Sequence, residues 1–133
     1  MSEGFKLKIV NPEKSFLSKD QVIEVVVPAF EGDMGILKDH ISIISFLKPG
    51  LVTVSNLDSS QEKYYVEDGI IEFKNNCLSI LTSNIFDIQK IDKNTIRDIL
   101  SKAEHSSQKE NLSDQNRYLI DQKIEVLKSI TLN

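Results

Sequence analysis

The chain has 133 residues, of which 40% are hydrophobic and 27% charged, and its formal net charge is −4. This length and composition fit one compact domain, or one domain plus a small appendage, and they argue against a globally disordered chain. The acidic balance, without any dense basic stretch, argues against nucleic acid as a partner.

The single cysteine, Cys77, cannot form an internal disulfide, and no Cys-x-x-Cys pair indicates a metal site. A reducing compartment is therefore expected. No apolar signal sequence is seen at the N-terminus, and no run reaches the roughly 18 apolar residues that span a membrane. We expect any association with a membrane to go through partner proteins.

Short apolar runs typical of strands fill the chain from residue 5 to about residue 88. Apolar residues alternate with lysines from Phe5 to Ile9, which predicts a half-buried strand. The β-branched run at residues 21–27 predicts a second strand, which Pro28 should end because proline cannot donate to a ladder. Further strands are expected at residues 41–47, 51–54, 63–66, 69–73 and 77–81.

Turn residues separate these runs. Asn75 and Asn76 predict a hairpin turn because asparagine tolerates positive φ. Two other turns are expected, one acidic and glycine-punctuated at Glu31–Gly35 and one at Lys48–Gly50. Short strands between closely spaced turns predict a β-sandwich or barrel.

After Gln89 the apolar spacing changes to that of helices. The first helix is expected to begin at an Asp92 N-cap and the second near Asn111 or Ser113. Their apolar faces are formed by Ile96, Ile99, Leu100 and Ala103, and by Leu119, Ile120, Ile124, Leu127 and Ile130. The sequence therefore predicts a mainly β fold with α, in which residues 1–89 form a sandwich domain and residues 90–133 an antiparallel helical hairpin.

Chemistry-bearing residues are sparse. Asp39 and His40 could be read as an acid–base pair, but neighbouring strand residues point to opposite faces, and no nucleophile motif accompanies them. Glu31 and Asp33 lack the ligand set of a calcium loop. We predict no catalytic residue, no metal site and no cofactor. From spacing alone, the Glu31–Gly35 turn is either a solvated hairpin or an acidic loop that docks onto cationic loops of a partner.

Three stretches of the sequence carry a family resemblance. From Glu31 to Val54 the chain contains Glu-Gly-Asp-Met-Gly-Ile-Leu, then Asp-His, then Leu-Lys-Pro-Gly-Leu-Val-Thr-Val. The opening strand at residues 7–13 and Asp-Gly-Ile-Ile-Glu-Phe at residues 68–73 continue the likeness. Together they closely resemble the epsilon subunits of F-type ATP synthases, over most of residues 5–104.

The resemblance implies a ten-stranded β-sandwich followed by a two-helix hairpin. It implies a non-catalytic rotor subunit of the central stalk, which links the gamma subunit to the proteolipid ring and couples proton flow to ATP synthesis. The hairpin can regulate ATP hydrolysis in the family, through contacts with catalytic-head subunits. The expected location is the cytoplasmic face of the bacterial inner membrane, bound there through these partners.

Individual residues carry over where they match the family pattern. Glu31, Gly32, Asp33 and Met34 correspond to the turn that contacts the proteolipid ring. The positions that face the gamma subunit are those of Asn11, His40 and Ser45.

Two departures from the family pattern are visible. Lys38 and Asp39 stand where the family has Pro-Gly, which changes the turn before His40. Thr95 and Ile96 replace the arginine and alanine of the nucleotide-binding form, which leaves Asp92 at most as a nucleotide-binding residue and argues against such binding.

Two other readings remain in competition with the rotor subunit. A stand-alone β-sandwich could bind a sugar or peptide, but such sites usually display exposed aromatic residues, and this chain has no Trp and only 7% aromatics. A small hydrolase would have to use Asp39 and His40. Neither reading explains the Glu31–Val54 motif or the order of strands and helices.

Overall fold

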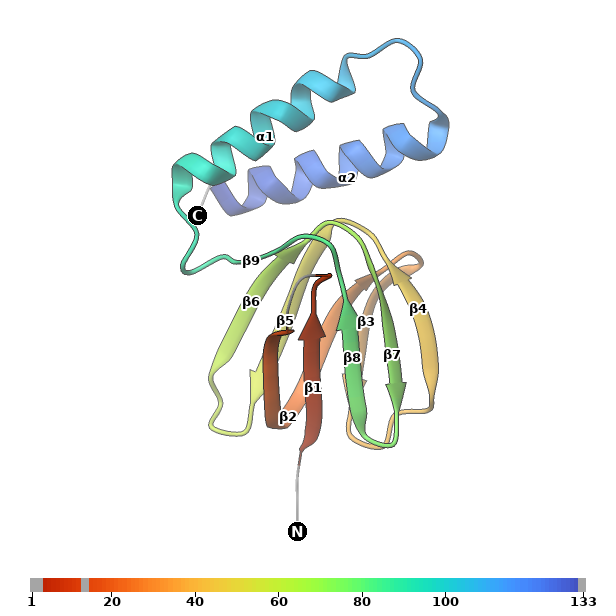
Figure 1. Cartoon of the computed structure of the whole chain (residues 1–133), viewed down its shortest axis with the longest axis vertical. Helices are drawn as coiled ribbons and strands as arrows, with labels where there is room; N and C mark the ends of the chain where they lie inside the picture. The colour runs from red at the N-terminus through yellow and green to blue at the C-terminus, as the bar shows by residue number, and fades with distance from the viewer. Residues whose placement is uncertain (1–3, 13–14, 132–133) are drawn as a thin grey trace.

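The computed structural model describes residues 4–12 and 15–131. Nine strands precede two helices in this part of the chain (Figure 1). The elements are β1 (Phe5–Val10), β2 (Ser15–Ala29), β3 (Gly32–Leu37), β4 (Ile43–Leu47), β5 (Gly50–Asn56), β6 (Gln61–Val66), β7 (Gly69–Lys74), β8 (Cys77–Leu81), β9 (Ile85–Asp87), α1 (Lys93–Ser107) and α2 (Asp114–Thr131).

The strands form two layers around one apolar core. One layer has the order β4–β7–β8–β1, and the other has β3–β2–β5–β6–β9. Strand β2 joins them, because it pairs with β1 along its first half and with β4 at its end. The predicted β-sandwich with a following helical hairpin is confirmed.

The fifteen-residue β2 takes part in two different pairings. Residues 15–22 pair with β1, whereas residues 22–29 pair with β3 and β5. The change falls beside Gln21, whose φ is 61°. Counting the two halves of β2 separately gives the ten strands that the family resemblance implies.

The predicted end of this strand at Pro28 is wrong, because β2 continues to Ala29. Its pairing with β5 reaches only Val26, so Pro28 pairs with Asp33 of β3 on one side. A proline in this edge-like position removes no ladder hydrogen bond on its other side. Its ring packs against Gly50, where an added Cβ would lie 2.5 Å from Pro28 Cβ.

Inward-facing positions of both layers are almost fully buried. Strand β1 alternates between buried apolar residues and exposed lysines, as its sequence predicts. The largest fully buried side chains of the sandwich core include Phe73, Leu7, Ile9, Ile36, Ile71, Leu78 and Ile80. The turn at Asn75 and Asn76 has positive φ at both residues, 52° and 54°, which confirms the predicted asparagine turn.

Both helices begin at predicted caps. The Asp92 side chain accepts a hydrogen bond from Asn94 N at 3.0 Å, and Ser113 Oγ accepts one from Asn116 N at 3.1 Å. The antiparallel hairpin lies across one end of the sandwich, with α2 nearer the strands than α1 (Figure 1). In the described residues neither helix is apolar enough over its length to cross a membrane.

Candidate interaction surfaces

The four predicted ring-contacting residues lie at a tight turn between β2 and β3. Ala29 pairs with Gly32, which leaves Phe30 and Glu31 as the two turn residues. Gly32 has φ 137°, a conformation that favours glycine. The side chains of Glu31 and Asp33 are exposed, whereas that of Met34 packs against the sandwich core. The exposed part of this turn is therefore acidic.

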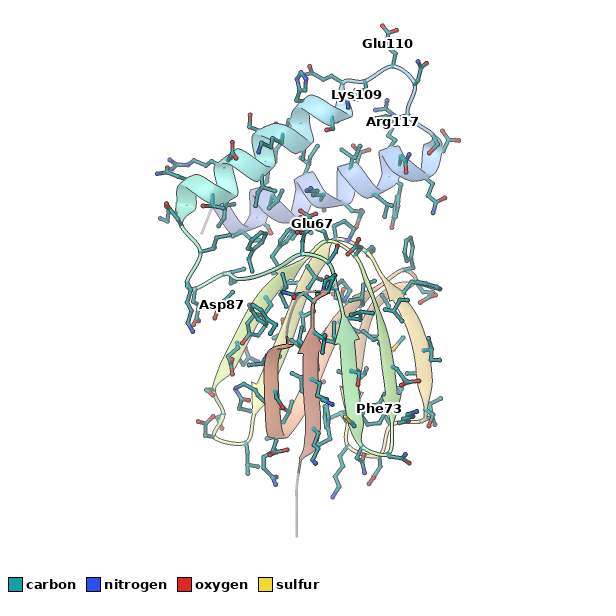
Figure 2. All side chains as sticks on the ribbon, in the orientation of Figure 1. Glu67, Phe73, Asp87, Lys109, Glu110 and Arg117 are labelled. Atoms are coloured by element: carbon teal, nitrogen blue, oxygen red, sulfur yellow. The ribbon has the colours of Figure 1, made fainter. Side chains whose placement is uncertain are left out.

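The residue pair Asp39–His40 lies at the opposite end of the sandwich from the helices. Asp39 exchanges hydrogen bonds with Asn76, while His40 Nδ1 donates to the Ile41 carbonyl at 2.8 Å. The His40 and Phe73 rings pack in a T-shaped arrangement, with centroids 5.9 Å apart, and Figure 2 shows Phe73 near that end. Each side chain thus has its own separate partners.

The three predicted gamma-facing residues are spread along one layer of the sandwich. Asn11 follows β1 at the end of the sandwich near the helices, and His40 precedes β4 at the other end. Ser45 lies in the middle of β4, where it pairs with Ile71, and its side chain is buried. The structure therefore does not gather these three side chains in one cluster: two lie at opposite ends of the β4–β7–β8–β1 layer and the third lies within it.

The outer face of this layer is apolar toward the helix end. Phe46, Ile70 and Leu81 are cross-strand neighbours on β4, β7 and β8, and they are 61%, 42% and 51% exposed. Ile44, one outward position along β4, is 67% exposed. We call these four residues the apolar face. A contiguous exposed apolar surface of this kind is typical of a site for binding another protein.

A groove borders the apolar face where the sandwich meets the hairpin. It has a volume of about 600 Å³, and its walls include Phe30, Phe46, Gly69 and Leu119. Leu119 belongs to α2, so sandwich and hairpin together form the groove. The acidic turn and the apolar face therefore meet at the end of the sandwich that carries the helices.

A polar network is found on the other layer. Glu62 accepts hydrogen bonds from Lys19, Asn56 and Tyr64, which lie on β2, β5 and β6. Burial acts to raise the pKa of Glu62, but these hydrogen bonds, led by that from Lys19, outweigh it and lower the pKa below its ordinary value. Since each donor lies on a different strand, the network ties three strands together.

The one candidate nucleotide-binding residue at the helix start already has a structural role. Asp92 is occupied as the N-cap of α1, and Ile96 is buried between the hairpin and the sandwich. Thr95 is exposed. In the residues that the structure describes, no three His, Cys, Asp or Glu side chains come together as a group that could hold a metal ion.

Sequence reasoning missed the apolar face and the contacts between sandwich and hairpin. The run Ile43-Ile44-Ser45-Phe46-Leu47 has apolar residues on both faces of its strand, which is the available signal for the apolar face. The contacts between sandwich and hairpin have no comparable signal in the sequence. Two polar contacts of this kind are seen: Lys48 Nζ lies 3.5 Å from Tyr118 Oη, and Lys123 Nζ lies 2.9 Å from Glu67 Oε1.

The fold and these surfaces define a class: a small β-sandwich protein with a helical hairpin, suited to contact other proteins. Residues 4–88 match the family described as ATP synthase, Delta/Epsilon chain, beta-sandwich domain. The chain belongs to this family.

Relatives match most of the chain's length. An ATP synthase epsilon chain of Pelagibacter ubique (strain HTCC1062) is 65% identical over 130 residues, which cover 98% of this chain and 99% of the relative. ATP synthase subunit delta, mitochondrial, of Schizosaccharomyces pombe is 31% identical, with 84% of this chain and 69% of the relative covered.

Solved structures share the fold. A chain in the cryo-EM structure of the Euglena gracilis mitochondrial ATP synthase OSCP/F1/c-ring superposes with a TM-score of 0.74 at 20% identity, covering 98% of this chain and 79% of that one. A chain in the Tetrahymena thermophila central stalk/c-ring structure gives 0.68 at 14% identity, with 95% of each chain covered.

Proposed function

We propose that this chain is a non-catalytic subunit of the rotor of an F-type ATP synthase. In this role it binds the gamma subunit of the central stalk and the proteolipid ring, and it transmits torque between them while other subunits carry out catalysis. Proton flow through the ring is thereby coupled to ATP synthesis. The chain is then peripheral to the cytoplasmic face of the bacterial inner membrane and held there by its partners.

The apolar face is the observation that supports this proposal best. Ile44 and Phe46 flank Ser45 on β4, so the strand predicted to face gamma exposes its apolar side chains outward. Complete burial of one fully exposed large apolar side chain is worth about 1.5–3 kcal/mol, and although these four side chains are already partly buried, together they can contribute to the affinity for gamma. Asn11 and His40 then lie at the margins of that interface.

The acidic turn suits the second contact of the proposed rotor subunit. Glu31 and Asp33 expose two carboxylates at the end of a short, well-defined hairpin. Exposed ion pairs contribute only about 0–1 kcal/mol each, so several contacts on a rigid turn must act together to bind the basic loops of a ring. Gly32 and Met34 fix the shape of the turn, through the φ of Gly32 and the packing of Met34.

The test introduces Phe46→Asp into this chain and measures how much gamma co-purifies with the chain from the assembled enzyme. A charge in the centre of the apolar face should strongly reduce the amount of gamma recovered, because the carboxylate would have to be desolvated. Leu57→Asp is the matched control, since Leu57 is also exposed, at 46%, but lies on the β5–β6 turn. If both variants retain gamma equally, the apolar face does not bind it.

We propose that the hairpin can regulate ATP hydrolysis by this complex. Contacts of α1 and α2 with the catalytic head would require the hairpin to leave the sandwich. The only cations of α2 are Arg117, Lys123 and Lys128, and Lys123 is paired with Glu67. We therefore expect any inhibition of ATP hydrolysis by this hairpin to be modest.

A further inference from the structure

The hairpin is attached to the sandwich by an apolar cluster that is separate from the sandwich core. Its buried centre consists of Tyr65 on β6, Ile96 on α1 and Leu127 on α2. Partly buried residues surround this centre: Leu51, Phe86, Ile88, Ile91, Ile99, Leu100, Val126 and Ile130. Both helices contribute to the cluster, whereas none of its residues belongs to the sandwich core, so the two helices can leave Tyr65 together without opening that core.

One ion pair joins the two parts of the molecule beside this cluster. Lys123 Nζ on α2 lies 2.9 Å from Glu67 Oε1 on the β6–β7 turn. The other ion pairs in the described ranges lie within the sandwich, within α1, or between Asp87 and Lys90 in the connection. Figure 2 shows Glu67 at the junction, directly beneath α2.

Glu67 is held in place by the sandwich independently of the helix. Its Oε1 accepts a hydrogen bond from Tyr65 Oη at 3.4 Å, and its Oε2 accepts one from Asn84 Nδ2 at 3.2 Å. The side chains of Glu67 and Lys123 are 20% and 26% exposed, so water screens them only in part. The Glu67 carboxylate is therefore a fixed, partly desolvated acceptor, and it can pair with a cation at only one position along α2, that of Lys123.

Apolar contacts and this ion pair constrain the hairpin differently. Contacts between aliphatic side chains tolerate small shifts of a helix, whereas a charged hydrogen bond requires one distance and direction. A partly buried pair can therefore specify one arrangement even where its net contribution to stability is small. Lys123 lies near the middle of α2, one turn before Leu127, so the pair also sets the register in which Leu127 is buried.

We propose that Glu67 and Lys123 form a polar latch that fixes the hairpin in its docked position, and that loss of the latch releases α1 and α2 without unfolding the sandwich. The latch is a property of the chain alone and does not depend on the proposed function. What release does to ATP hydrolysis does rest on that function, because it requires the catalytic head.

The test is amide hydrogen–deuterium exchange of the isolated full chain, comparing Lys123→Met with the unmodified protein. Met keeps most of the apolar stem but removes the charge, so the apolar cluster can still form. Exchange of the helices and of the segment around Phe86 should accelerate by roughly three- to tenfold, as expected for loss of a partly screened ion pair. Exchange in β1, β7 and β8 should stay unchanged.

Two further variants make the result specific. Glu67→Gln should reproduce the effect from the sandwich side of the latch. Lys102→Met removes the exposed pair between Lys102 and Asp98 within α1 and should leave the exchange pattern unchanged. Either of two results would overturn the proposal: Lys123→Met behaving like Lys102→Met, or accelerated exchange of β1, β7 and β8 together with the helices.

Discussion

Asp39 and Asn76 hold each other by two reciprocal hydrogen bonds. Asp39 N donates to Asn76 Oδ1 at 2.7 Å, and Asn76 Nδ2 donates to Asp39 Oδ1 at 2.9 Å. The pair ties the β3–β4 connection to the β7–β8 turn, 37 residues apart in the chain. Both residues have positive φ, 65° and 54°. Asp39 is thus used as a structural turn residue and not as a partner of His40.

The first prediction follows from this pair. Asp39→Ala should lower the free energy of unfolding by about 1–3 kcal/mol, because alanine loses a hydrogen bond and is strained at positive φ. Asp39→Asn is the control, since its amide oxygen can still accept from Asn76 and asparagine tolerates this φ. Urea denaturation followed by circular dichroism measures both. Equal stability of the two variants would show that the pair contributes nothing.

A second prediction concerns Gly69, at the start of β7. An added Cβ would lie 2.4 Å from the Leu81 carbonyl oxygen, and the residue has φ 151°. Gly69→Ala should therefore cost about 2 kcal/mol or more, because backbone would have to move. At Gly35 the nearest atom is the mobile Glu24 Oε2 at 3.2 Å, so Gly35→Ala should stay within about 0.5 kcal/mol. Thermal unfolding of both variants measures the two stability changes. A similar loss of stability in both would show that the backbone clash at Gly69 is not its cause.

Sequence alone predicts those parts of the structure that local physics decides. The alternation in β1, the asparagine turn at residues 75–76 and the caps Asp92 and Ser113 all depend on neighbours within a few residues. The path of β2 past Pro28 depends instead on which strand pairs with each of its edges, and that is a tertiary property.

The candidate surfaces divide in the same way. The acidic turn is visible in the sequence, because its two carboxylates and its glycines are neighbours in the chain. The exposure of Ile44 and Phe46 cannot be predicted in this way, since a run that is apolar apart from Ser45 is equally typical of a strand buried on both faces. The pairing of Glu67 with Lys123 joins residues distant in sequence and follows only from the docking of α2.

A third prediction tests the acidic turn in the assembled enzyme. Glu31→Lys combined with Asp33→Lys should weaken the coupling of proton flow to ATP synthesis, because two cations would face the basic loops proposed as partners. The sandwich should remain folded, since both side chains are exposed. ATP-driven proton pumping by membrane vesicles measures the coupling.

The control for this charge reversal is Asp20→Lys with Asp58→Lys. It makes the same change in net charge at exposed positions away from the acidic turn. Normal pumping by membranes that carry the Glu31 and Asp33 substitutions would contradict the proposal that this turn contacts the ring.

A fourth prediction concerns the hairpin in the complex. Truncation after Gln89 should raise the ATPase activity of membranes only modestly, because α2 presents few cations to the catalytic head. The measurement needs a check that the truncated chain is still bound, since removal of the hairpin uncovers Tyr65 and Phe86. A many-fold rise in activity with the truncated chain bound would contradict the expectation of weak inhibition.

The last prediction is a pH dependence that originates at Glu62. Its pKa in the folded protein lies below the ordinary value of 4.5, since the hydrogen bonds from Lys19, Tyr64 and Asn56 outweigh the effect of burial. The ionised carboxylate therefore stabilises the fold fully above pH 4.5, and this contribution is lost as the pH falls from there through the lowered pKa.

The variant Glu62→Gln tests this dependence, because its side chain cannot titrate. Its free energy of unfolding should lie about 1–2 kcal/mol below that of the unmodified chain at neutral pH, and the difference should shrink under acid. A difference that stays constant across this range in urea titrations would show that the charge of Glu62 does not stabilise the network.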